Sequence, residues 1–430
     1  MLDLKELRRD PETARARLAA RGDGARTGRA VDRILALDEE RRALVQEGDD
    51  LKRRRNEVSR EVAGRGQRGE EAGELIARMK GVAGRIKELD DRLREREKEL
   101  DDLLLRLPNL PLPGVPAGGE DCNRVVREWG EKAPAGEDRP THWEIGERLG
   151  IIDLPAGARV AGRGFPVFRG AGARLQRALV QWMLDLHTSS HGYTEVSPPY
   201  LVNRKAMTGT GQYPKFVEDG DAYAVEPDGL YLVPTSEVPL VNLHREEILD
   251  AGQLPIRYTA YSPCFRREAG AAGKDTRGLL RVHQFDKVEL VRFERPEQSP
   301  DALEEITSHA EEVLKQLRLA YRVVLLAAGD TGFAAAQTYD LEVWAPGVGR
   351  WLEVSSASNC ADFQARRASV RLRPQGGGKP EYVHTLNASG VALPRTVVAL
   401  LENGLQADGS VTLPDVLHPY LGSDRISPVS

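Results

Sequence analysis

The sequence predicts an α+β protein in which a long helical hairpin precedes a larger domain built from strands and helices. Three observations favour this class. Two apolar seams with heptad spacing run through residues 30–107. A linker rich in proline and glycine, LPNLPLPGVPAGGE, follows at residues 107–120. Beyond it, apolar and polar residues alternate as they do in half-buried strands. We therefore expect an N-terminal domain over residues 1–110 and a second domain over residues 111–430.

Composition limits the class of protein further. The chain has 430 residues, of which 40% are hydrophobic and 30% charged, enough for two or three domains with a buried core. Its first residues, MLDLKELRRD, contain no apolar signal segment, and no apolar run is long enough to span a membrane. Cys122, Cys264 and Cys360 lie far apart, which favours the reducing cytoplasm and argues against a disulfide framework or a cysteine-rich zinc site. Because the net charge is −5, any contact with nucleic acid must come from a local patch.

The N-terminal residues predict a short helix and then a coiled-coil hairpin. Asp10 can cap the short helix, Pro11 fits its first position, and Gly22 can end it. A glycine-rich turn is expected within Gly64–Gly73, between two helices of about 30 residues and therefore roughly 45–50 Å long. The first seam is Ile34, Leu37, Leu44, Leu51, Val58 and Val62, with Arg41, Gly48 and Arg55 at the remaining heptad positions. The second is Leu75, Met79, Val82, Ile86, Leu89, Leu93, Leu100, Leu103 and Leu107.

Basic residues gather on the first helix of the hairpin, between Lys52 and Arg68. A solvated face of a coiled coil is one interpretation. The other is a cationic surface that contacts the phosphate backbone of an RNA, for which a long arm has the reach. On that second interpretation the candidate contacts are Arg53, Arg54, Arg55 and Arg60.

After the linker, residues 141–149 predict a helix in which Thr141 and Glu144 form a capping box. Residues 163–196 predict a turn, a long amphipathic helix and a strand that ends before Pro198 and Pro199. His187 and His191 lie four residues apart, a spacing that can bind a metal. No third ligand is evident, so packing or capping is the preferred interpretation.

The most informative stretch is residues 264–290, CFRREAGAAGKDTRGLLRVHQFDKVEL, which predicts a strand, a long basic glycine-containing loop and a second strand. In the second strand Phe285, Lys287 and Glu289 share one face. An arginine fork beside two phenylalanines can hold a polyphosphate and a flat ring together. A solvated hairpin with scattered charges is the alternative.

Three further stretches carry polar groups at the ends of expected elements. Thr235, Ser236 and Glu237 open a helix, where a hydroxyl and a carboxylate can accept an ammonium group. In WLEVSSASN, Leu352 and Val354 are expected on one face and Glu353 and Ser355 on the other. Glu353 with Ser356 offers oxygen ligands to a hard cation. In VHTLNASGVALPR, a small-residue turn over residues 387–390 leads into a helix that carries Arg395.

The pattern FRxEAG, DTRGL and RxHQFDKVE resembles the second signature motif of class II aminoacyl-tRNA synthetases, in the form found in seryl-tRNA synthetases. The resemblance extends over essentially the whole chain. Residues 163–196 are similar to the first motif, which builds the dimer interface, and residues 383–404 to the third. The resemblance implies an antiparallel sheet flanked by helices. It also implies a homodimer and an arm that lies against the long variable arm of tRNA(Ser), while the acceptor end enters the catalytic domain.

The resemblance also implies the reaction and the roles of individual residues. L-serine and ATP form seryl-adenylate, and serine is then transferred to the 3′ end of tRNA(Ser), or of tRNA(Sec) where an organism has it. Mg²⁺ is implied at Glu353 and Ser356, and no zinc is expected. Arg266 is implied at the α-phosphate and Arg395 at the γ-phosphate. The implied serine ligands are Thr235, Ser236, Glu237, Glu289 and Ser389. The implied ATP site is Arg266, Arg267, Glu268, Val282, Phe285, Glu353, Val354, Ser355, Ser356 and Arg395, with Arg277 also on the phosphate side. Relatives often have Ser where this chain has Arg267.

Two rival functions differ from this one in class. A carrier-charging relative would activate an amino acid for a carrier protein, but such relatives lack the arm. An RNA-binding or regulatory relative would have lost its catalytic residues, whereas this chain has Arg266, Glu268, Glu289, Glu353 and Arg395. Serine-dependent ATP–pyrophosphate exchange followed by tRNA charging separates the three.

Overall fold

The computed structural model describes residues 1–69, 71–136, 139–269 and 277–428. It divides the chain into two compact units: one consists of Leu2–Ala19 and Asp23–Leu107, the other of Met1, Ala20–Gly22 and Pro108–Ser430. Residues 270–276, which carry most of the predicted basic loop, lie outside the described residues.

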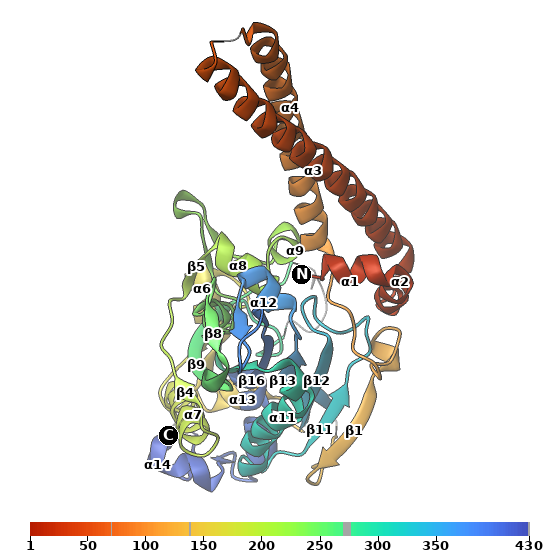
Figure 1. Cartoon of the computed structure of the whole chain (residues 1–430). Coiled ribbons are helices and arrows are strands. Elements are labelled where there is room, and N and C mark those ends of the chain that lie inside the picture. Colours follow the sequence, from red (N-terminus) through yellow and green to blue (C-terminus); the bar gives the residue numbers. More distant parts are fainter. Residues whose placement is uncertain (70, 137–138, 270–276, 429–430) are drawn as a thin grey trace. The chain divides into compact units, whose positions relative to one another are not determined.

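The first unit is entirely helical (Figure 1). Its helices are α1 (Leu4–Arg9), α2 (Pro11–Ala19), α3 (Gly24–Gln67) and α4 (Gly73–Arg106). The short helix predicted to begin at Pro11 with Asp10 as its cap is confirmed as α2, whereas α1 was not predicted. The Asp10 carboxylate accepts the Thr13 N–H at 3.1 Å, and Pro11 begins α2. Gly22, at φ +100°, lies in the turn before α3.

Helices α3 and α4 form the antiparallel pair that the two seams predict. Ile34 and Leu37 of α3 and Leu89 of α4 are fully or almost fully buried, whereas Leu51 and Met79 are only half-buried. The connection between the two helices contains fewer residues than predicted, because α3 continues to Gln67. At 1.5 Å per residue, α3 is about 65 Å long rather than 45–50 Å.

Charged side chains flank this seam and connect the two helices. Lys52 lies 2.9 Å from Asp90, and Arg85 lies 3.0 Å from Glu47. Arg55, predicted at a seam position, is exposed instead. The side chains that cross between the helices are therefore paired, while Arg55 is left on the outer surface of α3.

The second unit is built on an eight-stranded sheet in the order β1-β11-β12-β13-β16-β10-β9-β4. All neighbours pair antiparallel except β4 and β9, which are parallel. The strands are β1 (Arg124–Trp129), β4 (Thr194–Glu195), β9 (Ile256–Phe265), β10 (Gln284–Glu294), β11 (Tyr321–Leu325), β12 (Gln337–Ala345), β13 (Arg350–Asn359) and β16 (His384–Ala392). The helices are α5 (His142–Arg148), α6 (Leu154–Ala161), α7 (Ala171–Ser189), α8 (Arg204–Thr210), α9 (Lys215–Glu218), α10 (Glu237–Asn242), α11 (Ser299–Gln316), α12 (Phe363–Ala368), α13 (Leu393–Gly404) and α14 (His418–Leu421).

Four small sheets complete this unit, in the orders β2-β3, β5-β7-β6, β15-β14-β8 and β17-β18. Their strands are β2 (Ile152–Asp153), β3 (Val167–Phe168), β5 (Leu201–Asn203), β6 (Ala224–Val225), β7 (Leu230–Leu232), β8 (Ile248–Asp250), β14 (Arg371–Arg373), β15 (Glu381–Tyr382), β17 (Val411–Thr412) and β18 (Arg425–Ile426). Among the helices, α5 begins with the predicted capping box, in which the Thr141 N–H donates to the Glu144 carboxylate at 2.8 Å. Within the described residues, no helix is both long and apolar enough to cross a membrane.

The two faces of the large sheet have different roles. Helices α7, α11 and α13 pack on it and form the main core with residues such as Val288 and Leu290 of β10. Because side chains alternate along a strand, Lys287 and Glu289 face the opposite side. This alternation confirms the face predicted for β10, and it places the polar residues of the central strands away from the main core.

Two β-bulges alter the alternation that the sequence predicts. In β13, Glu353 pairs with Glu342 and Ser355 with Leu341, so Val354 is an extra residue. In β16, Gly390 is extra in the same way, because Val391 and Ser389 pair with consecutive residues of β10. The predicted turn over residues 387–390 is therefore wrong: these residues belong to β16, and the helix begins at Leu393.

Candidate active site

A cavity of about 760 Å³ opens on the polar face of the sheet. This volume suits a nucleotide-sized ligand. Its wall includes eleven of the residues predicted to form the site: Thr235, Glu237, Arg266, Glu268, Val282, Phe285, Glu353, Val354, Ser356, Ser389 and Arg395. They come from β10, β13 and β16, from the beginnings of α10 and α13, and from the segments that flank β9 and β10. Residues separated by up to 160 positions in the sequence thus line one cavity.

One end of the cavity combines an arginine with an aromatic ring. Arg266 directly follows β9, and its guanidinium lies 5.4 Å from the centre of the Phe285 ring on β10. Arg266 also donates to the Pro234 carbonyl at 3.4 Å, which holds it at the wall. Glu268 pairs with Arg281 at 2.9 Å. A planar cation beside an aromatic face can hold a base and its phosphates at the same time.

A second region contains a buried group of charged side chains. Lys287 lines the cavity, donates to the Thr235 hydroxyl at 2.8 Å and forms an ion pair with Glu289. Glu289 is fully buried and also accepts from the Asn387 amide at 3.2 Å. Glu289 lies behind Lys287 and is not part of the cavity wall. No role was predicted for Lys287, and its contact with Thr235 appears only when α10 and β10 come together.

Glu237 lies near Lys287 and Glu289 and also lines the cavity. Burial, and then the nearby charge of Glu289, raise the pKa of Glu237 to about 7. The Gln364 amide donates to Glu237 at 2.5 Å, and Gln364 in turn accepts from the Thr385 hydroxyl at 2.7 Å. Gln364, on α12, was not predicted. This arrangement fixes a carboxylate that changes charge near neutral pH.

The opposite side of the cavity is acidic. Asp340 and Glu342 of β12 line it together with Glu353 and Ser356 of β13. Burial, and then the charge of Glu353, raise the pKa of Asp340 well above its usual value. Its Oδ1 atom is buried and has no hydrogen-bond partner among the described residues. Crowded carboxylates of this kind fit a cation, which would relieve their mutual repulsion.

Arg395 contacts Glu353, one member of this acidic group. Its Nη1 atom donates to the Glu353 carbonyl at 2.8 Å and to the Glu353 carboxylate at 3.2 Å. Across the described ranges of the chain, no three His, Cys, Asp or Glu side chains are grouped so that they could hold a metal ion.

Besides Glu289, the predicted site residues Ser236, Arg267, Arg277 and Ser355 are not part of the cavity wall. The Ser236 hydroxyl is fully buried and donates to Ser262 at 2.6 Å. The Ser355 hydroxyl donates to the Ser389 carbonyl at 2.6 Å, because the bulge at Val354 turns it to the other face. The guanidinium of Arg267 lies 5.4 Å from the centre of the Tyr223 ring. The predicted alternation of Glu353 and Ser355 was thus wrong, and Ser356 shares the face of Glu353.

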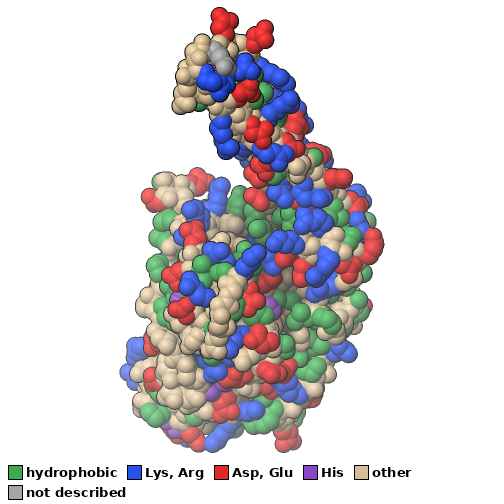
Figure 2. All heavy atoms as spheres, in the orientation of Figure 1, with side chains coloured by type: hydrophobic (Ala, Val, Ile, Leu, Met, Phe, Trp, Pro, Cys, Tyr) green, Lys and Arg blue, Asp and Glu red, His purple; other side chains and the backbone are tan. Residues whose placement is uncertain are grey.

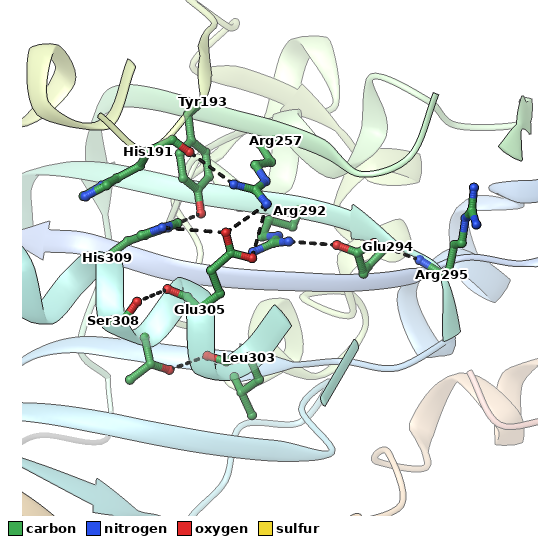
Figure 3. A network of polar contacts seen from close by, with 11 residues as sticks. His191, Tyr193, Arg257, Arg292, Glu294, Arg295, Leu303, Glu305, Ser308 and His309 are labelled. Carbon is green, nitrogen blue, oxygen red and sulfur yellow. Dashed lines mark hydrogen bonds and ion pairs between the residues drawn. The ribbon is translucent and has the colours of Figure 1, made fainter. Parts of the chain in front are cut away.

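His191 belongs to a separate polar network on the other face of the sheet (Figure 3), and His187 contacts His191. Their Nδ1 atoms lie 2.9 Å apart, and the His191 ring stacks on His309 of α11 with centres 4.1 Å apart. The Tyr193 hydroxyl contacts His309 at 3.2 Å. Burial is the main cause that lowers the pKa of His187 to about 3 and of His309 to about 4. These neutral rings pack together.

Two family models match the chain. The seryl-tRNA synthetase N-terminal domain matches residues 1–111, and the tRNA synthetase class II core domain (G, H, P, S and T) matches residues 223–404. A serine–tRNA ligase of Geobacter sulfurreducens is 55% identical over 98% of this chain and 99% of its own, and one of Gemmatimonas aurantiaca is 53% identical over the same shares. The crystal structure of seryl-tRNA synthetase from Pyrococcus horikoshii complexed with ATP has a TM-score of 0.94 and 40% identity, covering all of both chains.

Proposed function

The chain belongs to the seryl-tRNA synthetases, ATP-dependent serine–tRNA ligases, and we propose how its residues divide the work of the reaction. In the first step a serine carboxylate oxygen attacks the α-phosphorus of ATP. An O–P bond forms, the bond to the β-phosphate oxygen breaks, and pyrophosphate leaves. In the second step a ribose hydroxyl at the 3′ end of the tRNA attacks the carbonyl carbon of the adenylate, AMP leaves, and the hydroxyl proton is released.

We assign the adenine ring to the Phe285 face and the α-phosphate to Arg266. During in-line displacement, negative charge is spread over the equatorial oxygens of the phosphoryl group that is attacked. A fixed guanidinium stabilises that charge without reorganising. Arg395, at the far wall, is assigned to the γ-phosphate, so the two arginines hold opposite ends of the triphosphate. The contact between Arg266 and Phe285 is the observation that carries the assignment.

We assign the serine ammonium to Glu237 and Thr235, and the serine hydroxyl to the buried pair of Lys287 and Glu289. The support is geometric: Lys287 reaches both Thr235 and Glu289. An alanine in this place would leave the Glu289 carboxylate without the hydroxyl donor. Sites built to bind a hydroxyl reject the analogue that lacks it by about 10⁴-fold.

Mg²⁺ fits the acidic side of the cavity, where Glu353, Ser356 and the unpartnered Oδ1 of Asp340 would hold it. When bound there it would neutralise phosphate charge. Arg395, which touches Glu353, would then place the γ-phosphate beside the same carboxylate.

The exposed arginines of α3 are assigned to the tRNA backbone. Figure 2 shows Lys and Arg side chains gathered along the hairpin among acidic ones. Arg53 pairs with Asp50 at 2.6 Å, whereas Arg54, Arg55 and Arg60 have no ion pair with any of the residues described. An arginine without an ion pair can bind a phosphate without first breaking an interaction with a carboxylate. The long variable arm and the acceptor end of tRNA(Ser) are the proposed contacts.

We also assign a homodimer, formed where α7 leads to β4. The support is that β4 is a two-residue strand at the edge of the large sheet. The three free thiols suit the reducing cytoplasm. Sedimentation across a dilution series tests the dimer, and a single species with the mass of one chain at micromolar concentration would contradict it.

Arg266→Ala tests the assignment of the α-phosphate. Serine-dependent ATP–pyrophosphate exchange should fall by at least about 100-fold, as it does when one oxyanion-type donor is removed. Arg267→Ala is the matched control, because this neighbouring arginine contacts Tyr223 outside the cavity. Near-normal exchange in a folded Arg266→Ala protein would remove Arg266 from the mechanism.

A further inference from the structure

We propose that His142 and Trp143, at the start of α5, are positioning residues that fix the segment Arg277–Leu280 and, through it, Arg395 for binding ATP. This proposal rests on the role assigned to Arg395 above. Neither His142 nor Trp143 lies in the cavity wall, whereas Leu279, Leu280 and Arg395 do. The two α5 residues therefore act at one remove from the nucleotide.

Three consecutive residues of the segment meet these two side chains. The Arg277 guanidinium lies 4.6 Å from the centre of the Trp143 ring. Gly278, at φ +67°, approaches so closely that a Cβ atom there would lie 2.2 Å from His142 Nε2. The Leu279 N–H donates to the same Nε2 atom at 3.0 Å. A side chain at position 278 would separate the segment from α5, so glycine is required there for contact as well as for backbone conformation.

The hydrogen bonds of His142 define its tautomer. Because Nε2 accepts from Leu279, the ring proton lies on Nδ1 and is donated to the Glu402 carboxylate at 2.9 Å. Glu402 is itself held, since it accepts the Gly347 N–H at 2.8 Å and the His142 N–H at 3.0 Å. His142 and Glu402 are both fully buried, so neither hydrogen bond competes with water.

The segment that contacts His142 also contacts Arg395. The Arg395 Nε atom donates to the Leu280 carbonyl at 3.2 Å, one residue beyond the amide that His142 holds. Arg395 and Glu402 both belong to α13, seven residues and two turns apart. His142 therefore connects the two ends of one short path: from Glu402 on α13, through α5 and Leu279–Leu280, and back to Arg395 on α13. Loosening the hydrogen bond from Leu279 to His142 frees the carbonyl that orients Arg395.

Two substitutions of His142 separate positioning from general packing. In His142→Asn the amide nitrogen replaces Nδ1 and still donates to Glu402, but the Leu279 N–H has no acceptor. In His142→Gln the amide oxygen reaches the place of Nε2 and still accepts from Leu279, while Glu402 keeps its backbone donors. His309→Asn is the matched control, since it makes the same change in a partly buried ring outside the cavity, whose contacts are Tyr193, His191 and Glu305.

Pyrophosphate exchange is measured with ATP and serine titrated separately. We expect His142→Asn to raise the KM for ATP about tenfold or more while the KM for serine changes less than about threefold. We expect His142→Gln to stay within about threefold of the parent for both substrates, and His309→Asn to leave the KM for ATP unchanged. Equal increases in the two KM values, or equal effects of the Asn and Gln substitutions, would overturn the proposal.

Two further variants keep the test decisive. Arg395→Ala should itself raise the KM for ATP, and His142→Asn should add little in that background. If Arg395→Ala has no effect, the role of Arg395 fails; if it has one and His142→Asn alone has none, the positioning proposal fails. Should His142→Asn not fold, Trp143→Leu replaces it, because removing the ring beneath Arg277 should likewise raise the KM for ATP and not that for serine. An unchanged KM for ATP in folded Trp143→Leu would then overturn the proposal.

Discussion

Glu237 illustrates how a single side chain ties the site to pH. Its carboxylate lies beside a second buried carboxylate, Glu289, and is hydrogen-bonded to Gln364. Burial and that neighbour raise its pKa to about 7, so at neutral pH it exists in both charge states. Only the ionised form attracts the ammonium group of serine.

We therefore expect kcat/KM for serine to fall about tenfold when the pH decreases from 8 to 6, because kcat/KM follows the free enzyme and the ionised fraction falls through pH 7. Glu237→Gln should lower kcat/KM at least about tenfold and remove this pH dependence, since the amide does not titrate. Pyrophosphate exchange at several pH values and subsaturating serine measures both. A profile in Glu237→Gln that still falls below pH 7 would assign the titration to another group.

At this scale the sequence predicted the cavity side chains that follow from motif and alternation, such as Arg266 and Phe285. It did not predict Lys287 or Gln364 as partners of Thr235 and Glu237, because those contacts join elements that are far apart in the chain. It placed Ser355 on the wrong face because nothing in WLEVSSASN marks Val354 as a bulge. Pairing with β12 decides that position, and pairing is a property of the folded sheet.

Among the elements, His187 of α7 and His309 of α11 both lie near His191, which follows α7. The groups that face them are Tyr193, Arg257 on β9, Arg292 on β10 and Glu305 on α11 (Figure 3). Glu312 on α11 adds a further charge near His191. The folded-state pKa values of His187 and His309, about 3 and about 4, lie below the ordinary value of 6.5. The unfolded chain therefore binds protons first as the pH falls. The stability that these neutral rings contribute is present above pH 6.5 and is lost as the pH falls toward 4.

We expect thermal unfolding to occur at a lower temperature at pH 5 than at pH 7, with roughly 2 kcal/mol of this loss due to each of His187 and His309. His309→Gln should reduce the difference between the two pH values, because one titrating ring is removed. His418→Gln, which changes a partly exposed histidine, serves as the control. An undiminished difference in His309→Gln would show that this joint does not carry the acid sensitivity.

The elements themselves were largely predictable where their pattern is long. The seams of α3 and α4 and the alternation of β9 and β10 extend over many residues, so each is supported by repeated observations. The short helices α2 and α5 were predictable because a capping residue marks the start of each. Helix α1 was not predicted, and Asn387–Gly390 was predicted as a turn although it belongs to β16. A glycine is compatible with a turn as well as with the bulge at Gly390.

For the whole molecule, the division into two units predicts that the two activities can be separated. The residues of the cavity wall all belong to the unit that contains Pro108–Ser430, whereas α3 and α4 belong to the other. Replacing residues 35–100 with a short turn should leave serine-dependent pyrophosphate exchange within about threefold of the parent. Charging of serine tRNA should fall at least about 100-fold, because the arm no longer binds the phosphates of the tRNA.

A milder version replaces Arg54, Arg55 and Arg60 with Gln in the full chain. The dependence of tRNA affinity on salt should become shallower by about 0.7–0.9 for each phosphate that the arm ceases to bind. The control replaces three exposed arginines of the other unit, Arg318, Arg373 and Arg425. Circular dichroism checks that the hairpin is intact. Normal charging by the armless protein at physiological salt would contradict the role of the arm, as would failure of the folded armless protein to make adenylate.

The two bulges described above determine which face of the sheet each side chain of β13 and β16 occupies. Val354 of β13 has no paired residue on β12, and Gly390 of β16 has none on β10. Leaving out either of these residues would restore strict alternation and keep every other side chain on its present face. Leaving out any other single residue between Glu353 and Ala357 would, without a new bulge, exchange interior and cavity side chains along part of the strand. Deletion of a single residue is therefore compatible with the present faces of the active-site side chains at two positions, Val354 and Gly390, because each is already an extra residue in its strand.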